Sequence, residues 1–563
     1  MRLPIGYDNF KEVIDKKLDF VDKTLFIKEI IDDPAKVILI NRARRFGKTF
    51  NLSILEHFFA KEVTGITTKG LFDNFKIAEL PNYMAYQGKY LVINLTFKEM
   101  KGKTFESLYK AFSKLISDLY TTHYTLLDKN LLFEQEKIYF QDIIKLQAEP
   151  EILKSALADL TMYLFRAYKT PIIILIDEYD SPIQQGYING FYEDAIELMR
   201  SFLSPALKGN ANLEKGILTG ILRIAKESMF SDLNNLKVYS ILNERYSTHF
   251  GFTEEEVNIL LEKSNLQQKQ NEIKNWYNGY RIGKTTIYNP WSIINYIHEQ
   301  GKLGPYWINT SDNALIKGLL ISSTVSFKSQ LESLMRQQSL ERIINENIVF
   351  PYLKTSESAL WTLLLMSGYL KAFFIKDTEL GPSYQISIPN IEVTGLYRSI
   401  IAEWLSGVND ASVFNKVILD LLNGQVEDFA EHLQIIMLQT FSAHDIKGKN
   451  PEKFFHGFIL GLLAHIDRNA YTIDSNKESG LGRYDIILIP NDTTKLCVIF
   501  ELKSIDTDNV DRLMEAAELA HKQIDEKQYI QTALQRHVKE CLKIGAAFGG
   551  KLLRLKYSQE YIK

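Results

Sequence analysis

The sequence has few of the residues that mark secreted, metal-binding or membrane proteins. Its 563 residues include two cysteines, Cys497 and Cys541, which argues against a disulfide framework or zinc site and favours the reducing cytoplasm. The ten histidines show no metal-binding spacing. The start of the chain has no signal-peptide core, and the longest apolar run, residues 455–466, is too short to cross a bilayer. We therefore expect no membrane partner.

An excess of charge of either sign is also absent. Lysine and arginine number 66 against 69 aspartates and glutamates, so any nucleic-acid surface must be local. No internal repeat or low-complexity segment is evident. Hydrophobic residues make up 45% and charged residues 24%, which is typical of a globular protein long enough for about three to four domains.

The N-terminal part alternates short apolar runs with helical stretches. Because these runs are continuously apolar, they predict strands buried on both faces of a sheet. We therefore expect an α/β domain with a largely parallel sheet over residues 1–251. The runs are residues 37–40, 90–95, 171–176 and 216–222.

The pattern then changes twice. Residues 252–422 read as a mostly helical lid or middle region, with helices at 254–264, 311–320 and 392–405. Residues 423–563 predict a compact α/β unit in the order α-β-β-β-α-β. Its predicted elements are a helix at 451–468, strands at 471–475, 483–490 and 495–503, a helix at 510–528 and a strand at 551–557.

A glycine-lysine-threonine triplet follows the first apolar run and opens a helix. This context predicts a phosphate-binding loop built by Arg45, Phe46, Gly47, Lys48 and Thr49, whose backbone N–H groups gather at a helix N-terminus. Lys48 would reach the β- and γ-phosphates of a nucleotide, and the Thr49 hydroxyl would ligate Mg²⁺. The alternative is a chance triplet at a helix start.

Two carboxylates end the third apolar run. Residues 172–176 lead directly into Asp177 and Glu178, and a charge at the end of a buried strand is costly unless it has a partner. In an ATPase, Asp177 would hold Mg²⁺ while Glu178 would orient or deprotonate the attacking water. The alternative is a strand that simply emerges into solvent.

Polar residues also mark the fourth apolar run. Thr219 lies inside it and could sense the γ-phosphate, while Arg223 follows it and could stabilise transition-state charge. A surface arginine is an equal alternative for Arg223. Arg42, Arg44 and Arg45 could also bind phosphate or a partner.

These segments together resemble the AAA-ATPase-like family. The matching segments are Leu-Pro-Ile-Gly at 3–6, Phe-Val-Asp-Lys-Thr at 20–24, Arg-Arg-Phe-Gly-Lys-Thr at 44–49, Ile-Asp-Glu-Tyr-Asp at 176–180, Trp-Tyr-Asn-Gly-Tyr at 276–280 and Tyr-Asn-Pro-Trp-Ser at 288–292. Arg42 stands in place of the usual first glycine, which members of the family also lack, and Ala43 replaces a usual proline. The resemblance implies an ATP-binding fold related to AAA+ and STAND switches, and it covers roughly residues 3–300.

A second constellation lies near the C-terminus. Glu501 and Lys503 are two positions apart on a predicted strand, so they share one face, and Asp485 on the neighbouring strand can meet them. Two carboxylates can hold Mg²⁺, which activates a water, while the lysine positions that water or offsets charge. The alternative is a solvated strand face or a cross-strand ion pair.

This pattern resembles the PD-(D/E)XK nuclease superfamily over residues 423–563. The superfamily's Asp, Glu and Lys map to Asp485, Glu501 and Lys503, and Tyr484 stands where proline is usual. Gln523 and Tyr529 resemble an accessory motif of some branches. A further upstream acid is expected, for which the candidates are Glu478, which we favour, and Glu452.

Two functions compete. The first is a nuclease dependent on Mg²⁺, or alternatively Mn²⁺, and controlled by ATP; it acts on nucleic acid, with DNA favoured over RNA. The second is a STAND-like ATP switch whose nuclease-fold domain binds nucleic acid or protein without cleavage. Because no expected metal ligand is replaced, we favour the first. ATP-driven remodelling is a third reading, and the sequence leaves a homo-oligomer open.

Overall fold

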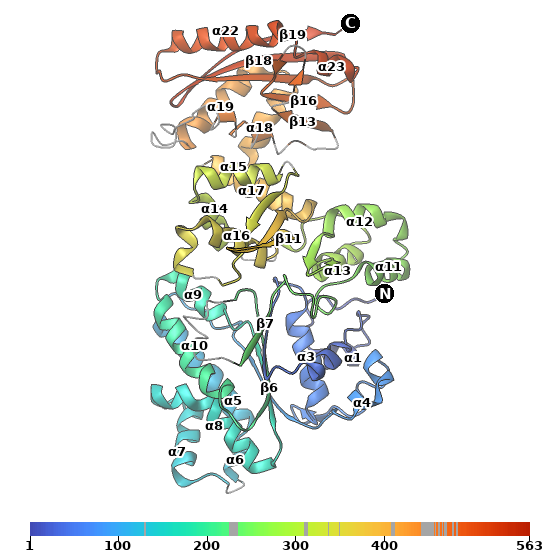
Figure 1. The fold of residues 1–563 in the computed structure, drawn as a ribbon, viewed down its shortest axis with the longest axis vertical. Coiled ribbons are helices and arrows are strands. Elements are labelled where there is room, and N and C mark those ends of the chain that lie inside the picture. Colours follow the sequence, from blue (N-terminus) through green and yellow to red (C-terminus); the bar gives the residue numbers. More distant parts are fainter. Residues whose placement is uncertain are drawn as a thin grey trace. The chain divides into compact units, whose positions relative to one another are not determined.

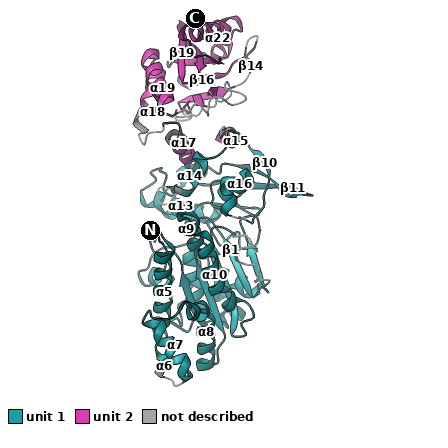
Figure 2. Ribbon diagram, turned by 90° about the vertical axis from the view of Figure 1, so that its left-hand side faces the viewer, with its two compact units in different colours: residues 1–327, 337–393 teal, residues 328–336, 394–563 magenta. Residues whose placement is uncertain are grey.

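The structure is a computed structural model with two compact units (Figure 2). Unit 1 comprises Met1–Phe327 and Gln337–Val393, and unit 2 comprises Lys328–Arg336 and Thr394–Lys563. Among the described helices, none is both long and apolar enough to cross a membrane. The structure describes residues 1–128, 131–223, 235–308, 314–335, 337–347, 350–406, 411–440, 455–456, 458–459, 462–463, 466, 470–475, 478–479 and 482–562.

A parallel five-stranded sheet forms the centre of unit 1. Its order is β4-β5-β6-β1-β7, and every neighbouring pair is parallel. The four predicted strands are present, and all residues of β1 and β5 are buried, as their continuous apolar sequences require. The fifth strand was not predicted. The bounds are β1 (Val37–Asn41), β4 (Leu91–Thr96), β5 (Ile172–Asp177), β6 (Leu213–Gly220) and β7 (Leu236–Tyr239).

Helices cover both faces of this sheet. In Figure 1, α1 and α3 lie on one side of it and α5, α8 and α10 on the other. A short hairpin, β2 (Glu62–Val63) and β3 (Ile66–Thr67), follows α3. The helices are α1 (Phe10–Asp15), α2 (Phe26–Asp32), α3 (Lys48–Phe59), α4 (Pro81–Met84), α5 (Phe105–Thr122), α6 (Thr125–Asp128), α7 (Glu134–Ile144), α8 (Pro150–Tyr168), α9 (Ser181–Asn189) and α10 (Tyr192–Leu207).

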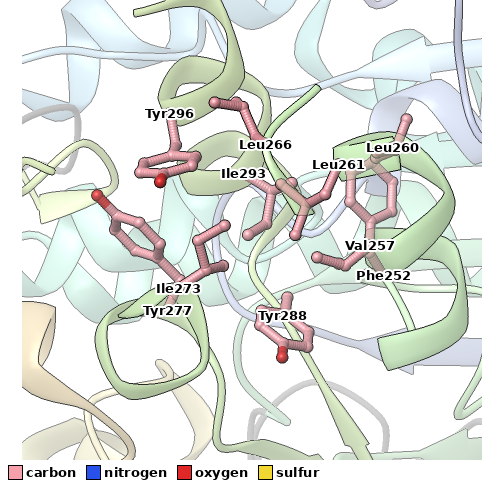
Figure 3. Close-up of a cluster of buried hydrophobic side chains, with 10 residues drawn as sticks. All are labelled: Phe252, Val257, Leu260, Leu261, Leu266, Ile273, Tyr277, Tyr288, Ile293 and Tyr296. Atoms are coloured by element: carbon pink, nitrogen blue, oxygen red, sulfur yellow. The ribbon is translucent and has the colours of Figure 1, made fainter. Parts of the chain in front are cut away.

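A small helical subdomain follows the sheet. Thr253 caps α11 in a capping box with Glu256, and the Glu256 carboxylate also binds Lys23 at 2.7 Å, which ties this subdomain to the N-terminal segment. Its core is apolar and aromatic, with Tyr277 and Tyr296 in contact at 5.9 Å between ring centroids (Figure 3). The elements are α11 (Glu254–Lys263), α12 (Gln270–Tyr277), β8 (Tyr280–Ile282), β9 (Thr285–Ile287) and α13 (Pro290–His298).

The rest of the middle region is mainly helical, as predicted, but it also contains an antiparallel sheet of order β10-β12-β11. The sequence pattern did not predict this sheet, because the apolar run at residues 372–375 reads equally as helix or strand. The elements are α14 (Ala314–Ile321), α15 (Val325–Met335), β10 (Leu340–Ile343), α16 (Glu357–Met366), β11 (Lys371–Thr378), β12 (Gly381–Ser387) and α17 (Ile391–Ser406), of which α15 and α17 continue into unit 2.

Unit 2 is built on a second five-stranded sheet of order β13-β16-β17-β18-β19. β17 and β18 are parallel, and the other neighbours are antiparallel. The elements are α18 (Ala411–Leu422), α19 (Val426–Thr440), β13 (Tyr471–Ser475), β14 (Glu478–Ser479), β15 (Gly482–Arg483), β16 (Ile486–Pro490), β17 (Cys497–Ser504), α22 (Val510–Glu526), α23 (Gln531–Gln535), β18 (Glu540–Gly549) and β19 (Leu552–Tyr561).

The predicted order of unit 2 therefore lacks one strand. β18 lies between the last helices and the final strand in the chain; it pairs along its whole length with β19 and over residues 541–548 with β17. Its sequence has glycines and alanines and a single β-branched residue, so intrinsic propensity does not indicate a strand, and burial in the sheet decides it. Most of the predicted helix at 451–468 lies outside the described residues.

A buried acid begins the helix that leaves unit 1. Glu392 is 1% exposed, and its carboxylate accepts hydrogen bonds from the backbone N–H of Trp307 at 2.7 Å and the Ser292 hydroxyl at 2.8 Å. Burial raises the pKa of Glu392 to about 7, although the hydrogen bonds from Trp307 and Ser292 oppose the shift.

This pKa sets an expected pH dependence of stability. Between pH 4.5, the ordinary pKa, and about 7, the folded protein binds more protons at Glu392 than the unfolded chain does, so Glu392 reduces stability as pH rises. Relative to a Glu392→Gln protein, wild type should lose up to about 3 kcal/mol between pH 4.5 and 8. Calorimetric Tm values measured across this range, with exposed Glu379→Gln as the control, test this. A difference that is constant or grows in favour of wild type with pH would contradict it.

Candidate nucleotide-binding and nuclease sites

The loop after β1 has the backbone of a phosphate-binding loop. Arg45 (φ 66°) and Gly47 (φ 83°) both adopt the left-handed conformation, and Gly47 stands immediately before α3. Lys48 is 4% exposed, and its Nζ donates to the backbone oxygens of Arg42 at 3.2 Å and Ala43 at 3.3 Å. The same atom lies 3.2 Å from the Glu178 carboxylate. An ion pair therefore holds the lysine at the mouth of the loop.

The Asp177 carboxylate lies between two hydroxyl groups. Thr49 and Thr219 each donate to it at 2.6 Å, one from α3 and one from β6. This is possible because β6 pairs with both β1 and β5, so that the carboxyl ends of the three strands meet at one edge. Burial, followed by the charge of Glu178, raises the pKa of Asp177. Thr219 thus contacts Asp177, a partner that the sequence did not indicate.

Arg42 does not face the loop, which contradicts its suggested role in phosphate binding. Its side chain is fully buried, lies over the Phe250 ring at 5.2 Å, and donates to the backbone oxygens of Asn41 and Tyr239. Burial lowers the pKa of Arg42 to about 9. This arginine stands where such loops usually have glycine, and its side chain packs among Asn41, Tyr239 and Phe250.

A cavity of about 520 Å³ opens above the loop. Its polar side carries Arg44, Arg45, Lys48, Lys98 and Lys101. Its apolar side comes mainly from residues in or beside three segments that the sequence analysis singled out without assigning them a role, 3–6, 20–24 and 288–292, together with Phe252. These residues are Leu3, Pro4, Gly6, Tyr7, Phe20, Val21, Phe252, Pro290, Trp291 and Ile294. Such a mixture of cationic and aromatic lining suits a phosphorylated ligand with a flat apolar group.

Lys98 and Lys101 were not among the predicted site residues. Both follow β4, and the carboxyl ends of parallel strands are where such sheets bind ligands, which is the signal that could have found them. Phe46 lines the cavity and also packs edge-on against Tyr280 at 5.1 Å. The Arg45 guanidinium lies over the Trp291 ring at 4.4 Å.

Arg223 does not line this cavity. Arg223 directly follows Leu222, whose backbone is fixed by three hydrogen bonds. The Leu222 oxygen accepts from Tyr179 and Asn41, each at 2.6 Å. The Leu222 N–H donates to Asp180 at 2.9 Å. Asp180 is fully buried, and this burial raises its pKa to about 6. The turn is fixed, but the described structure gives Arg223 no contact with the loop.

In unit 2 the structure brings five of the predicted residues together. Gln523 on α22 donates to the Glu501 carboxylate and accepts a hydrogen bond from Lys503 Nζ at 3.1 Å. The Tyr529 hydroxyl lies 3.4 Å from the Gln523 amide and is close enough to Glu501 and Asp485 for both charges to affect its pKa. Asp485 accepts from the backbone N–H of β17 at Leu502, at 2.7 Å.

The close approach of α22 makes this cluster possible. Glu501 pairs in register with Gly545 on β18, and a Cβ on Gly545 would lie 2.3 Å from the backbone of Ala517 and His521. Only glycine lets the helix run this near the strand. The side chain of Glu478 is not described, Glu452 lies outside the described residues, and His456 Nε2 donates to the Asp485 backbone oxygen at 3.2 Å.

Comparison with known protein families agrees with both parts of this geometry. A family model described as a predicted AAA-ATPase matches residues 4–230, and a model of the PD-(D/E)XK nuclease superfamily matches residues 450–557. The chain joins an AAA-ATPase-like domain to a PD-(D/E)XK nuclease superfamily domain. The predicted fold class is thereby confirmed for both ends of the chain.

Whole-chain comparisons add one curated relative and two solved structures. An uncharacterized protein in the vnfD 5'region of Azotobacter chroococcum mcd 1 is 24% identical over 523 residues, covering 90% of each chain. The Aeropyrum pernix ORC1 protein in complex with DNA is 10% identical, with 71% of this chain and 98% of that chain covered and a TM-score of 0.21. Drosophila ORC bound to AT-rich DNA and Cdc6 is 9% identical, with 69% and 90% covered and a TM-score of 0.17.

The residues of the nuclease-like domain fit a divalent cation. Asp485, immediately before β16, and Glu501, on the neighbouring β17, supply carboxylate oxygens, the ligands that Mg²⁺ prefers. Burial raises the pKa of Asp485, although the Leu502 N–H and the Lys503 charge oppose the shift. A bound cation would relieve this cost of burying a carboxylate. Among the described residues, three His, Cys, Asp or Glu side chains do not gather at one point, so Asp485 and Glu501 are the residues that would hold the cation.

The Gln523 contacts give an expected outcome for metal binding that needs no activity assay. Gln523→Glu places a carboxylate beside Glu501, so without metal it should lower stability by about 1–2 kcal/mol through like-charge repulsion. Added Mg²⁺ should then raise the Tm of this variant more than that of wild type. Calorimetry in EDTA and in Mg²⁺ measures both effects, and Gln535→Glu, exposed on α23, is the matched control. Equal Mg²⁺ responses of the two variants would argue against a cation at this site.

Proposed function

We propose that the protein is a metal-dependent nuclease that cleaves nucleic-acid phosphodiesters under the control of ATP. The observation that carries the nuclease part is the hydrogen-bonded cluster of Glu501, Lys503 and Gln523 beside Asp485. A solvated strand face or a simple ion pair does not account for it, because Lys503 binds Gln523, and Glu501 is 5% exposed. An accessory helix that orients both charges suits catalysis better than stability.

Each residue of the cluster has a separate role in the proposed cleavage of a phosphodiester. Asp485 and Glu501 would hold Mg²⁺ or Mn²⁺, which when bound activates a water and binds a phosphate oxygen. The amide nitrogen of Gln523 donates to Glu501 and the amide oxygen accepts from Lys503, so Gln523 orients both side chains. Lys503 is thereby held near the metal ligands, where its ammonium group offsets charge that develops on the phosphate. Tyr529 is buried beside Gln523 and supports its amide.

The nucleotide site supports ATP as the controlling ligand. Lys48 and Thr49 are positioned for phosphates and Mg²⁺, and Asp177 stands beside Thr49. The ion pair between Lys48 and Glu178 must open when phosphate reaches Lys48, which releases the Glu178 carboxylate to orient water. Nucleotide entry therefore exchanges one ionic partner of Lys48 for another. The aromatic side of the cavity would hold the base.

The partners follow from these sites. Nucleic acid is the substrate, and DNA is the first to be tested, as favoured by the sequence analysis. The proposed compartment is the cytoplasm, consistent with two free buried cysteines. Arg223 is proposed to approach the nucleotide only when the loop is occupied, and Glu478 to complete the acidic set of the nuclease site.

Cleavage of labelled DNA and RNA, single- and double-stranded, with Mg²⁺ or Mn²⁺ and with or without ATP, tests the proposal. Asp485→Asn and Lys503→Ala should each reduce the rate by about 10²-fold or more, because each removes a group that acts on the reacting phosphate. Lys48→Ala should remove the response to ATP. Asp492→Asn and Lys110→Ala, both on exposed surface, are the matched controls and should behave as wild type.

Two results would decide against the proposal. Cleavage that survives Asp485→Asn would belong to another site or to a contaminant. If nothing is cut while nucleotide still binds in a Lys48-dependent way, the protein acts instead as an ATP switch whose nuclease-fold domain binds without cutting.

A further inference from the structure

Two sequence motifs remain outside the phosphate chemistry described above. These are Trp-Tyr-Asn-Gly-Tyr at residues 276–280 and Tyr-Asn-Pro-Trp-Ser at 288–292. Both lie in unit 1. Pro290 and Trp291 of the second motif line the cavity, but Asn278 and Ser292 make other contacts. Their contacts lead instead to the start of α17.

The phosphate-binding loop rests directly on the middle region. The indole Nε1 of Trp307 donates to the backbone oxygen of Arg44 at 3.0 Å. Around it, the Tyr280 ring lies 5.8 Å and the Tyr369 ring 5.3 Å from the Trp307 ring. Gly368 brings its backbone so close that an added Cβ would lie 2.9 Å from the Cβ of Ala43. Trp307 is thus a buried residue that is hydrogen-bonded to the backbone of the loop.

The other side of Trp307 binds the first turn of α17. Its backbone N–H donates to Glu392 Oε1 at 2.7 Å, and Ser292 from the second motif donates to Oε2 at 2.8 Å. The first motif supports the same turn, because Asn390 Nδ2 donates to the Asn278 oxygen at 2.9 Å while its Oδ1 caps Val393. The start of α17 is therefore attached to both motifs and to Trp307.

This helix is one of the places where the chain passes between the units. Val393 is the last residue of unit 1 and Thr394 belongs to unit 2, although both lie in α17 (Ile391–Ser406). A continuous helix therefore joins the first turn of α17 to the chain of unit 2. Glu392 lies immediately before Val393, the last residue of unit 1.

Peptide geometry explains how a phosphate would act on Trp307. The Arg44 oxygen and the Arg45 N–H belong to one planar peptide, so they point in opposite directions and turn together. If the Arg45 N–H turns toward a bound phosphate, the Arg44 oxygen must turn with it, and its bond to Trp307 Nε1 changes. Arg45 already has a positive φ of 66°, a strained conformation for a residue with a side chain.

We propose that Trp307 and Glu392 form a relay that transmits the nucleotide state of the phosphate-binding loop to α17 and so to the nuclease-like unit. The relay assigns a role to the two motifs: they hold Glu392 and Asn390 in place so that a movement of Trp307 shifts the whole first turn. This inference rests on the proposed function only in requiring that nucleotide binds at the loop.

Hydrogen exchange at residues 391–406 measures the relay directly. In wild type, a slowly hydrolysed ATP analogue should change exchange rates in this segment by about 5-fold or more. Trp307→Phe keeps an aromatic ring but removes the N–H donor, so it should abolish most of this change while nucleotide Kd stays within about 3-fold. Glu392→Gln leaves one hydrogen bond without an acceptor and should reduce the change in the same direction.

Trp361→Phe is the matched control. Trp361 is also 1% exposed in unit 1, but its Nε1 has no hydrogen-bond partner among the described residues, so the variant should respond as wild type. The relay is overturned if Trp307→Phe keeps the full nucleotide response, if Trp361→Phe loses it equally, or if wild type binds nucleotide with no change at 391–406.

A parallel cleavage assay separates this inference from the proposed function. No cleavage by wild type, together with an exchange response that depends on Trp307, supports the relay and refutes the nuclease. ATP-dependent cleavage without any exchange response at 391–406 supports the nuclease and refutes the relay. Absence of nucleotide binding refutes both.

Discussion

The pairing of β6 between β1 and β5 is the constraint on which the nucleotide site depends. β1 delivers the phosphate-binding loop, β5 delivers Asp177, and β6 contributes Thr219, which binds the Asp177 carboxylate from the side. If this register slipped by one residue, every side chain of the strand would face the opposite side of the sheet. The five-stranded sheet is therefore a positioning device for a few side chains at its edge, and the continuous apolar sequences of β1 and β5 are what keep it in place.

The two sites manage buried charge in opposite ways. At the nucleotide site, Lys48 and Glu178 neutralise one another, so the resting loop needs no ligand to hold its lysine. At the nuclease-like site, Gln523 stands between Lys503 and Glu501 and binds both, and Asp485 accepts from the backbone N–H of Leu502. The first arrangement suits a lysine that exchanges one ionic partner for another, and the second suits the metal binding proposed above.

The sequence predicted the parts of the fold that local pattern determines. Continuous apolar runs indicated four of the five strands in unit 1, and the spacing of Glu501 and Lys503 indicated their common face. The sequence did not predict β18, whose glycines and alanines have low strand propensity but suit the close approach of α22. It also did not predict where Arg42 points, or that Trp307 touches the loop 263 residues away, because such contacts arise only from the tertiary fold.

The position of β18 in the chain has a consequence for synthesis. β17 carries Glu501 and Lys503, but its parallel neighbour is made only after the α22 and α23 segments, so the second sheet cannot close until residues 540–549 have left the ribosome. The last residue that lines the nucleotide cavity is Ile294, and the contacts of its loop with Trp307 and Gly368 also precede unit 2's sheet in the chain. A growing chain can therefore complete the nucleotide cavity before it can complete the second sheet. The order of the two parts along the chain therefore makes the proposed nuclease site the later of the two to form.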